Sequence, residues 1–265
     1  MLAKRLKRGI SGWSVAGILS LMIAISMGVL FFGGDLIRST SAQGEFELAQ
    51  ERFVAIAGTL NGRLSIKGFS TYTVVNCWHG NLIVQSLPAY VTLENTYGVK
   101  IFDYPYTVEY PVYIAGMLAS PKTYLGSSIS RLEVTPLLGE MKPVVTSSIA
   151  GVYAGFDENI NRYYVQVHPA RVKIIKSTID NTNHYAIMVV DVDAREISIT
   201  STRLKVEFTV ESVDLYTFTV SNGPWNLKVK IGDLEDTYTF YDGDTITLII
   251  SHVTLNIEPM KQFPW

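Results

Sequence analysis

The chain contains no charged residue from position 9 to position 34. This stretch is longer than the roughly 20 apolar residues that cross a bilayer as a helix. Positions 4–8 in front of it hold four basic residues, and the first acidic residue after it is Asp35. Because Lys and Arg beside a spanning helix stay in the cytoplasm, the sequence predicts a single-pass membrane protein with a cytoplasmic N-terminus and an extracellular C-terminal region.

Cysteine and charge are scarce elsewhere as well. Cys77 is the single cysteine of the 265 residues, which excludes an internal disulfide. Charged residues make up 17% and the net charge is −2, so nothing in the charge balance favours nucleic acid as a partner. The chain is rich in aromatic residues, with 15 tyrosines and 11 phenylalanines, and this composition favours strands.

The sequence also lacks the motifs of enzymes and of cofactor sites. It has no nucleophile elbow, no zinc-binding helix motif and no phosphate-binding loop. Cys77 and His79 share one face of a predicted strand but have no third partner at a ligand spacing. Residues 157–161 have the first spacings of a calcium loop, but Arg162 stands where that loop requires glycine. We therefore expect no catalysis, no cofactor and no metal, with a buried thiol and a polar hairpin turn at these places.

Two simple interpretations fit residues 1–42. Thr40-Ser41-Ala42 offers a small-residue site at which a secretory signal peptide could be cleaved, although Asp35 and Arg38 stand before it. Alternatively, the apolar segment is a permanent signal anchor that tethers an outer domain. Both make the segment a targeting or anchoring device and nothing more.

A third interpretation comes from the small residues of this segment. They recur at every fourth position and form one stripe along a helix: Gly12, Ala16, Ser20, Ala24 and Gly28. Helices in a membrane associate where small residues let their backbones approach closely. The stripe therefore predicts a helix that packs in a bundle with others.

The tripeptide Lys7-Arg8-Gly9, followed at once by Ile10 and an unbroken apolar helix, resembles the class III signal peptide of archaeal type IV pilins and archaellins. The resemblance covers the N-terminal helix only. It implies that residues 1–9 are a leader, that a prepilin-type peptidase cuts between Gly9 and Ile10, and that the assembly machinery moves the chain from the lipid bilayer into a filament. Ser14 is the fifth residue after the cut, where bacterial pilins carry glutamate; archaeal members commonly lack it.

A second helical pattern follows the first. Apolar residues at alternating steps of three and four predict a buried seam formed by Phe46, Ala49, Phe53, Ile56 and Leu60. We expect one N-terminal helix over residues 10–60, which spans the membrane over about 11–34 and then packs on an outer domain. Asn61-Gly62 is expected to end it, and residues 39–44, which have weak helix propensity, are expected to form a hinge or a softened turn.

The rest of the chain predicts short strands separated by turns. We expect a mainly β fold in which an antiparallel β-sandwich follows the helix, with two β regions at 61–142 and 143–265. One elaborated sandwich or two sub-domains would both accommodate the expected strands, which lie at 63–67, 71–77, 81–85, 90–94, 106–117, 130–135, 144–154, 162–168, 171–177, 185–191, 196–200, 204–211, 216–221, 227–231, 237–241, 245–250 and 253–258.

Taken with the resemblance, these patterns predict a structural subunit of a pilus-like or archaellum-like filament. Its helix would self-associate, and its β head would serve adhesion or motility at the cell surface. The alternative is a permanently anchored single-pass protein whose β ectodomain binds a ligand or a partner in the cell envelope.

Overall fold

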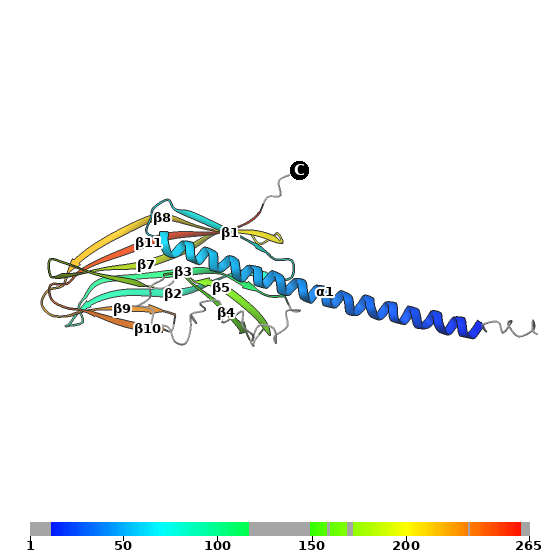
Figure 1. Cartoon of the computed structure of the whole chain (residues 1–265). Helices are drawn as coiled ribbons and strands as arrows, with labels where there is room; N and C mark the ends of the chain where they lie inside the picture. Colours follow the sequence, from blue (N-terminus) through cyan, green and yellow to red (C-terminus); the bar gives the residue numbers. More distant parts are fainter. Residues whose placement is uncertain (1–11, 117–148, 158–159, 169–171, 233, 261–265) are drawn as a thin grey trace, which may run out of the picture. The chain divides into compact units, whose positions relative to one another are not determined.

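The computed structural model describes residues 12–116, 149–157, 160–168, 172–232 and 234–260, and it is mainly β (Figure 1). One helix, α1 (Gly12–Arg63), precedes the strands. These are β1 (Ser70–Asn76), β2 (Asn81–Asn95), β3 (Lys100–Ile114), β4 (Gly151–Asp157), β5 (Arg162–His168), β6 (Lys173–Ile179), β7 (Thr182–Ile197), β8 (Arg203–Thr219), β9 (Trp225–Ile231), β10 (Leu234–Phe240) and β11 (Thr245–Pro259).

The chain divides into two compact units, Met1–Ser41 and Ala42–Trp265. The division falls inside α1, within the segment 39–44 where the sequence predicted a hinge or a softened turn. Helical structure nevertheless continues through this segment. The hydroxyls of Ser39 and Thr40 donate to the carbonyl of Leu36, at 3.0 and 2.8 Å, so these weak helix formers are accommodated by bonds back to the preceding turn.

A membrane-spanning helix was expected over about residues 11–34. Among the residues that the structure describes, no helix has the length and hydropathy required to cross a membrane.

All the strands belong to one sheet. Its order is β1-β8-β11-β7-β3-β2-β9-β10, with β6 beside β7 and with β5 and β4 added beside β3. The prediction of a wholly antiparallel sandwich is wrong, because β11 and β3 each pair with β7 in parallel. Alternating apolar residues show that a strand has a buried face, but they carry no information about the direction of its neighbour, so the sequence could not distinguish a mixed sheet.

Several expected strands are pieces of longer ones. The pairs 81–85 and 90–94, 185–191 and 196–200, 204–211 and 216–221, and 245–250 and 253–258 merge into β2, β7, β8 and β11. In β11 the expected break is a bulge, where the register against β8 shifts between His252 and Val253. The strand expected at 63–67 is wrong, because Arg63 ends α1 and a turn follows it. The strand expected at 130–135 lies outside the described residues.

The two β regions share one sheet and one core. The boundary expected at 142/143 lies outside the described residues, but strands from either side of it pair with each other. In the first pairing, β2 lies beside β9, with Val91 opposite Val229. In the second, β3 meets β7 where Val108 pairs with Val192. The four valines are at most 1% exposed.

The C-terminal half of α1 packs on this sheet. The expected seam is confirmed, because Phe46, Ala49, Phe53, Ile56 and Leu60 are all buried in the same core as the strands. The ring of Phe46 lies 6.1 Å from that of Tyr113 on β3 and 6.3 Å from that of Tyr163 on β5. The spacing of three and four therefore marks a helix face that docks on its own β domain.

Replacing Phe53 by alanine should strongly destabilise this domain, because the buried ring leaves a cavity between helix and sheet. We expect a loss of about 3–5 kcal/mol in the free energy of unfolding, measured by urea denaturation of the full chain in detergent. Val54, the next residue, is 42% exposed. Val54→Ala is the control, with an expected change of about 0.5 kcal/mol or less. Equal losses in the two variants would contradict the docking.

Candidate functional site

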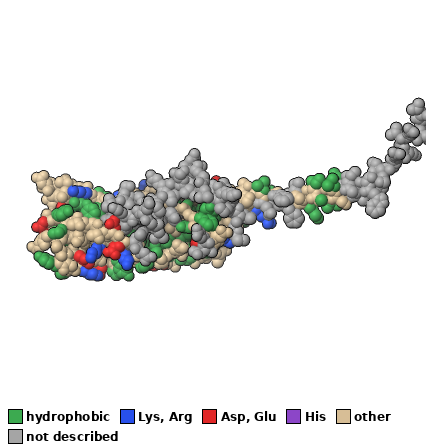
Figure 2. Space-filling view, turned by 90° about the horizontal axis from the view of Figure 1, so that it is seen from below, with side chains coloured by type: hydrophobic (Ala, Val, Ile, Leu, Met, Phe, Trp, Pro, Cys, Tyr) green, Lys and Arg blue, Asp and Glu red, His purple; other side chains and the backbone are tan. Residues whose placement is uncertain are grey.

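The N-terminal half of α1 presents apolar side chains without cover. Leu21, Met22 and Ile25 are 62%, 64% and 57% exposed, and Leu36 and Ile37 are exposed as well. Hydrophobic side chains follow one another along the described part of this segment in Figure 2. Large apolar surfaces of this kind mark places where a protein meets another protein or a lipid.

The expected site residues lie partly on this segment. Ser20 and Ala24 are exposed on α1, and Gly28 is half-buried; apart from the adjacent helix backbone, no described atom lies within 4 Å of the position that its Cβ would take. Gly12 and Ala16 also belong to α1, but the structure does not describe their exposure or contacts. The expected processing residues Arg8, Gly9 and Ile10 lie outside the described residues altogether.

The docked half of α1 is fastened near its start by Glu45. The β1–β2 loop (residues 77–80) turns three successive main-chain N–H groups toward this carboxylate. Trp78 donates at 3.0 Å, His79 at 3.2 Å and Gly80 at 3.1 Å. The buried hydroxyl of Tyr113 on β3 donates to the same carboxylate. Successive N–H groups that converge in this way form a strong anion-binding concavity, and here a side chain of the helix occupies it.

Glycines make this arrangement sterically feasible. A Cβ on Gly80 would lie 2.2 Å from the hydroxyl oxygen of Tyr113, and one on Gly116 would lie 2.3 Å from the carbonyl oxygen of His79. Larger residues at either position would displace the loop or the tyrosine from Glu45. The loop therefore owes its close approach to the helix to these two glycines.

A second fastening lies near the other end of the helix. The side-chain amide of Asn61 donates to the carbonyl of Ala150 at 2.9 Å, and its oxygen accepts from the N–H of Ala150 at 2.6 Å. The sequence indicated Asn61 only as part of a helix stop, yet α1 continues to Arg63. Asn61 thus ties the last turns of the helix to the segment that leads into β4.

The surroundings of Cys77 disfavour its ionised form. Burial, and after it the charge of Glu45, raise the pKa of the Cys77 thiol to about 12. The thiol is therefore protonated at neutral pH, whereas nucleophilic attack and metal binding need the thiolate. His79 serves the fold through its main-chain N–H, which donates to Glu45.

The acidic segment at 157–161 joins two paired strands. Asp157 on β4 pairs with Arg162 on β5, and Asn161 between them has a φ of 52°. This pairing agrees with the interpretation as a hairpin, while Glu158 and Asn159 lie outside the described residues. In the part of the chain that the structure describes, no three His, Cys, Asp or Glu side chains come together to hold a metal ion.

No family model matches the chain, and comparison with curated proteins and solved structures found no match. The inference about function therefore rests on this chain's own residues: an exposed apolar half of α1, and a docked half held by Glu45 and Asn61.

Replacing Glu45 by glutamine should loosen the β1–β2 loop from the helix, because a neutral amide oxygen is a weaker acceptor for three N–H groups. Hydrogen bonds to charged groups contribute about 1.5–3 kcal/mol, which is the expected loss of stability. The free energy of opening, measured by hydrogen exchange at the amides of Trp78, His79 and Gly80, should fall by a similar amount. The exposed Glu51→Gln is the control. Unchanged protection in the Glu45 variant would show that the carboxylate does not hold the loop.

Proposed function

We propose that this chain is a structural subunit of an extracellular filament of the pilus-like or archaellum-like kind. Its N-terminal helix assembles the filament, and its β head faces outward for adhesion or motility, without catalysis. The observation that carries the proposal is the set of exposed apolar side chains that α1 presents at residues 19–27 and at Leu36 and Ile37.

The energetics of this surface favour a covered state. Removing one large apolar side chain from water is worth about 1.5–3 kcal/mol. Leu19, Leu21, Met22, Ile23, Ile25 and Met27 follow one another within nine positions, and all are more than half exposed. Lipid before assembly, and the helices of neighbouring subunits after it, would supply the missing contacts.

The small-residue stripe favours neighbouring helices as the final cover. Among the described residues, and apart from the adjacent backbone of α1 itself, no atom lies within 4 Å of the Cβ position of Gly28, so its small size serves no packing that the structure describes. Ala24 lies one turn before Gly28 and Ser20 two turns before it, and both are exposed. Small residues at this spacing let two helix backbones approach closely.

The docked half of α1 suits the same role. A subunit that assembles through its helix has to carry the head with it, and this requires a firm joint between the two. The buried seam with Phe46 and Phe53, together with the Glu45 and Asn61 fastenings, supplies such a joint. A plain tether would need neither a docked helix nor a fastened loop.

The membrane stage of the proposal is supported by the charge-free stretch and by the resemblance at Arg8, Gly9 and Ile10. In this stage the chain crosses the bilayer once, with its N-terminus in the cytoplasm. A prepilin-type peptidase then removes residues 1–9, and the assembly machinery draws the mature helix into the filament.

One test of this proposal concerns the mature N-terminus. Intact mass and the N-terminal peptide of protein taken from native membranes and from sheared surface material should show a start at Ile10. An intact Met1 would overturn the filament proposal in favour of a permanently anchored protein whose head binds a ligand or an envelope partner. A start at Gln43 would show that a secretory signal is cleaved and would remove the assembly helix.

Another test concerns the stripe of small residues on α1. Ala24→Leu should reduce filament yield in sheared material, because overpacking a close helix contact costs about 1–3 kcal/mol per interface. That corresponds to roughly five- to 150-fold weaker association. Ser26→Leu adds a side chain of the same size on the opposite face of the helix and is the matched control. Equal yields of the two variants, at equal amounts of membrane precursor, would contradict assembly through the stripe.

A further inference from the structure

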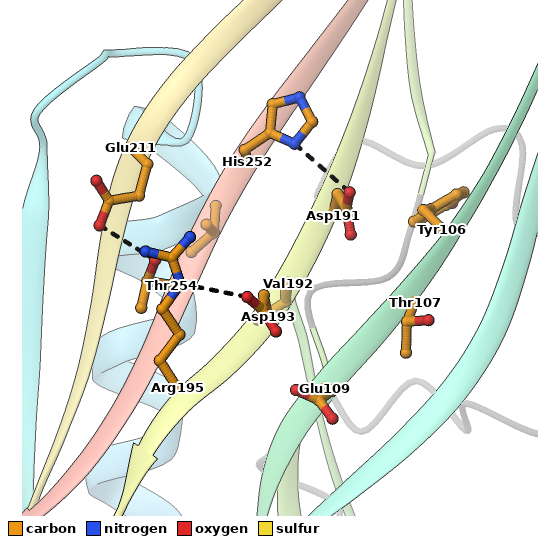
Figure 3. Close-up of a pocket in the computed structure, with 11 residues that line it drawn as sticks. Tyr106, Thr107, Glu109, Asp191, Val192, Asp193, Arg195, Glu211, His252 and Thr254 are labelled. Carbon is orange, nitrogen blue, oxygen red and sulfur yellow. Dashed lines mark hydrogen bonds and ion pairs between the residues drawn. The ribbon is translucent and has the colours of Figure 1, made fainter.

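The head contains a polar hollow of about 460 Å³ among β3, β7, β8 and β11. Its charged and titratable lining consists of Glu109, Asp191, Asp193, Arg195, Glu211 and His252. Figure 3 shows these side chains projecting from neighbouring strands around a common space. The hollow lies entirely within the unit Ala42–Trp265 and is separate from the assembly helix.

Irregular pairing of the strands creates this space. β3 meets β7 through the pairing of Val108 with Val192, so the two strands are joined over only a short length. On the other side, the register of β11 against β8 shifts between His252 and Val253, which leaves Glu211 as an extra residue in β8. Bulges of this kind redirect side chains and are common beside binding sites.

The lining is rich in acceptors and poor in donors. Its four carboxylates face one guanidinium, that of Arg195, which lies 3.2 Å from Asp193. The other carboxylates each accept from the protein: Asp191 from the Tyr104 hydroxyl at 2.6 Å, Glu211 from Thr254 at 3.1 Å, and Glu109 from the N–H of Ala194. An ionised carboxylate offers about four acceptor positions, so unused capacity remains on each.

His252 lies among the carboxylates and brings one more of them, Asp214, close to the hollow. Its ring lies between two carboxylates, with Nδ1 3.5 Å from Asp191 and Nε2 3.1 Å from Asp214. Figure 3 shows the ring directed toward Asp191. A ligand that satisfies the hollow must therefore bring hydrogen-bond donors and, to balance the acids, positive charge.

Tyr106 provides an independent sign of a missing partner. Its side chain lines the hollow and is 7% exposed, and its hydroxyl has no hydrogen-bond partner. Burial, and after it the charge of Asp191, raise the pKa of this hydroxyl above its ordinary value, so the group is a neutral donor and acceptor. Buried polar groups in native proteins are almost always paired, so the unpaired hydroxyl of a residue that lines the hollow is a donor and acceptor that a bound group could satisfy.

An aromatic pair adjoins the hollow: Tyr106 lines it, and Tyr104, which is not a lining residue, contacts Tyr106. The rings of Tyr104 and Tyr106 stack with centroids 5.7 Å apart at an interplanar angle of 25°. Ring faces attract organic cations through the ring quadrupole. A divalent metal is a poorer match, because the described residues hold no group of three acids or histidines close enough to chelate one.

We propose that this hollow binds an organic cation, an ammonium or guanidinium group that donates to the carboxylates and lies beside Tyr106. Two sources share this chemistry: a free small amine, and a Lys or Arg side chain of another protein chain. The proposal goes beyond filament assembly and does not depend on it, because every residue in it belongs to the head.

The test measures binding to the full chain in detergent by isothermal titration and by chemical-shift changes. The probes are cadaverine, which represents a free amine, and Nα-acetyl-lysinamide, which represents a side chain. 1-Pentanol is the uncharged probe of similar length. Both cations should bind and the alcohol should not. Tighter binding of cadaverine identifies a free amine as the source, and tighter binding of the lysine derivative identifies a protein side chain.

Two variants decide whether binding occurs in the hollow. Glu211→Gln keeps an acceptor for Thr254 but removes one charge, and it should weaken cation binding about fivefold or more. Glu235→Gln removes the same charge from an exposed position on β10 and should leave the affinity within about twofold. Equal effects of these two variants, or binding of 1-pentanol as tight as that of the amines, would overturn the proposal.

Tyr106→Phe tests the unpaired hydroxyl without altering the shape of the core. If the hydroxyl contacts the bound cation, the variant should bind more weakly while it unfolds at the same denaturant concentration as the parent or a higher one. If affinity is unchanged, the hydroxyl has no part in the site and that element of the proposal is wrong. Absence of cation binding to the parent chain would overturn the whole proposal.

Discussion

The hydrogen bonds between the carboxylate of Glu45 and the backbone of the β1–β2 loop constrain how the helix, the loop and β3 meet in the head. Glu45 accepts from three successive N–H groups of the β1–β2 loop and from Tyr113 of β3. Through this one side chain, α1 holds the loop between β1 and β2, and the tyrosine connects it to β3. Gly80 and Gly116 are constrained in turn, because any side chain on them would collide with the loop or with Tyr113.

The single long helix combines two surfaces with different requirements. Up to Ser41 its described side chains are largely exposed and apolar, whereas from Ala42 one face is buried in the core of the head. The hydroxyls of Ser39 and Thr40 donate to the carbonyl of Leu36 in the segment where the exposed half of the helix meets the half with a buried face. Helical structure continues through this segment. In the proposed filament, assembly and folding would draw on different residues of one element, so that changes in the first half need not disturb the head.

Much of the local structure was predictable from the sequence, and the long-range structure was not. The helix and its buried seam follow from the spacing of Phe46, Phe53 and their neighbours, and most strand positions follow from alternation. Strand direction and order do not, because the parallel pairing of β11 with β7 depends on contacts between distant segments. The fastening by Glu45 was missed because an acidic residue beside a seam usually faces solvent. The polar hollow was missed because Asp191, Glu211 and His252 are far apart in sequence and converge only through a bulge and a parallel pair.

The position of β11 also determines when the sheet can be completed. This strand is the last one described, yet it lies near the middle of the sheet, hydrogen-bonded to β8 on one side and to β7 on the other. Until it is synthesised, β7 and β8 have no neighbour on these inner edges, and each presents a row of open N–H and C=O groups. Folding from the N-terminus can therefore build two separate half-sheets at most. The late joining of distant segments is slow, and during that interval the open edges could pair with another copy of the chain, a hazard that a chaperone or the membrane surface would have to control.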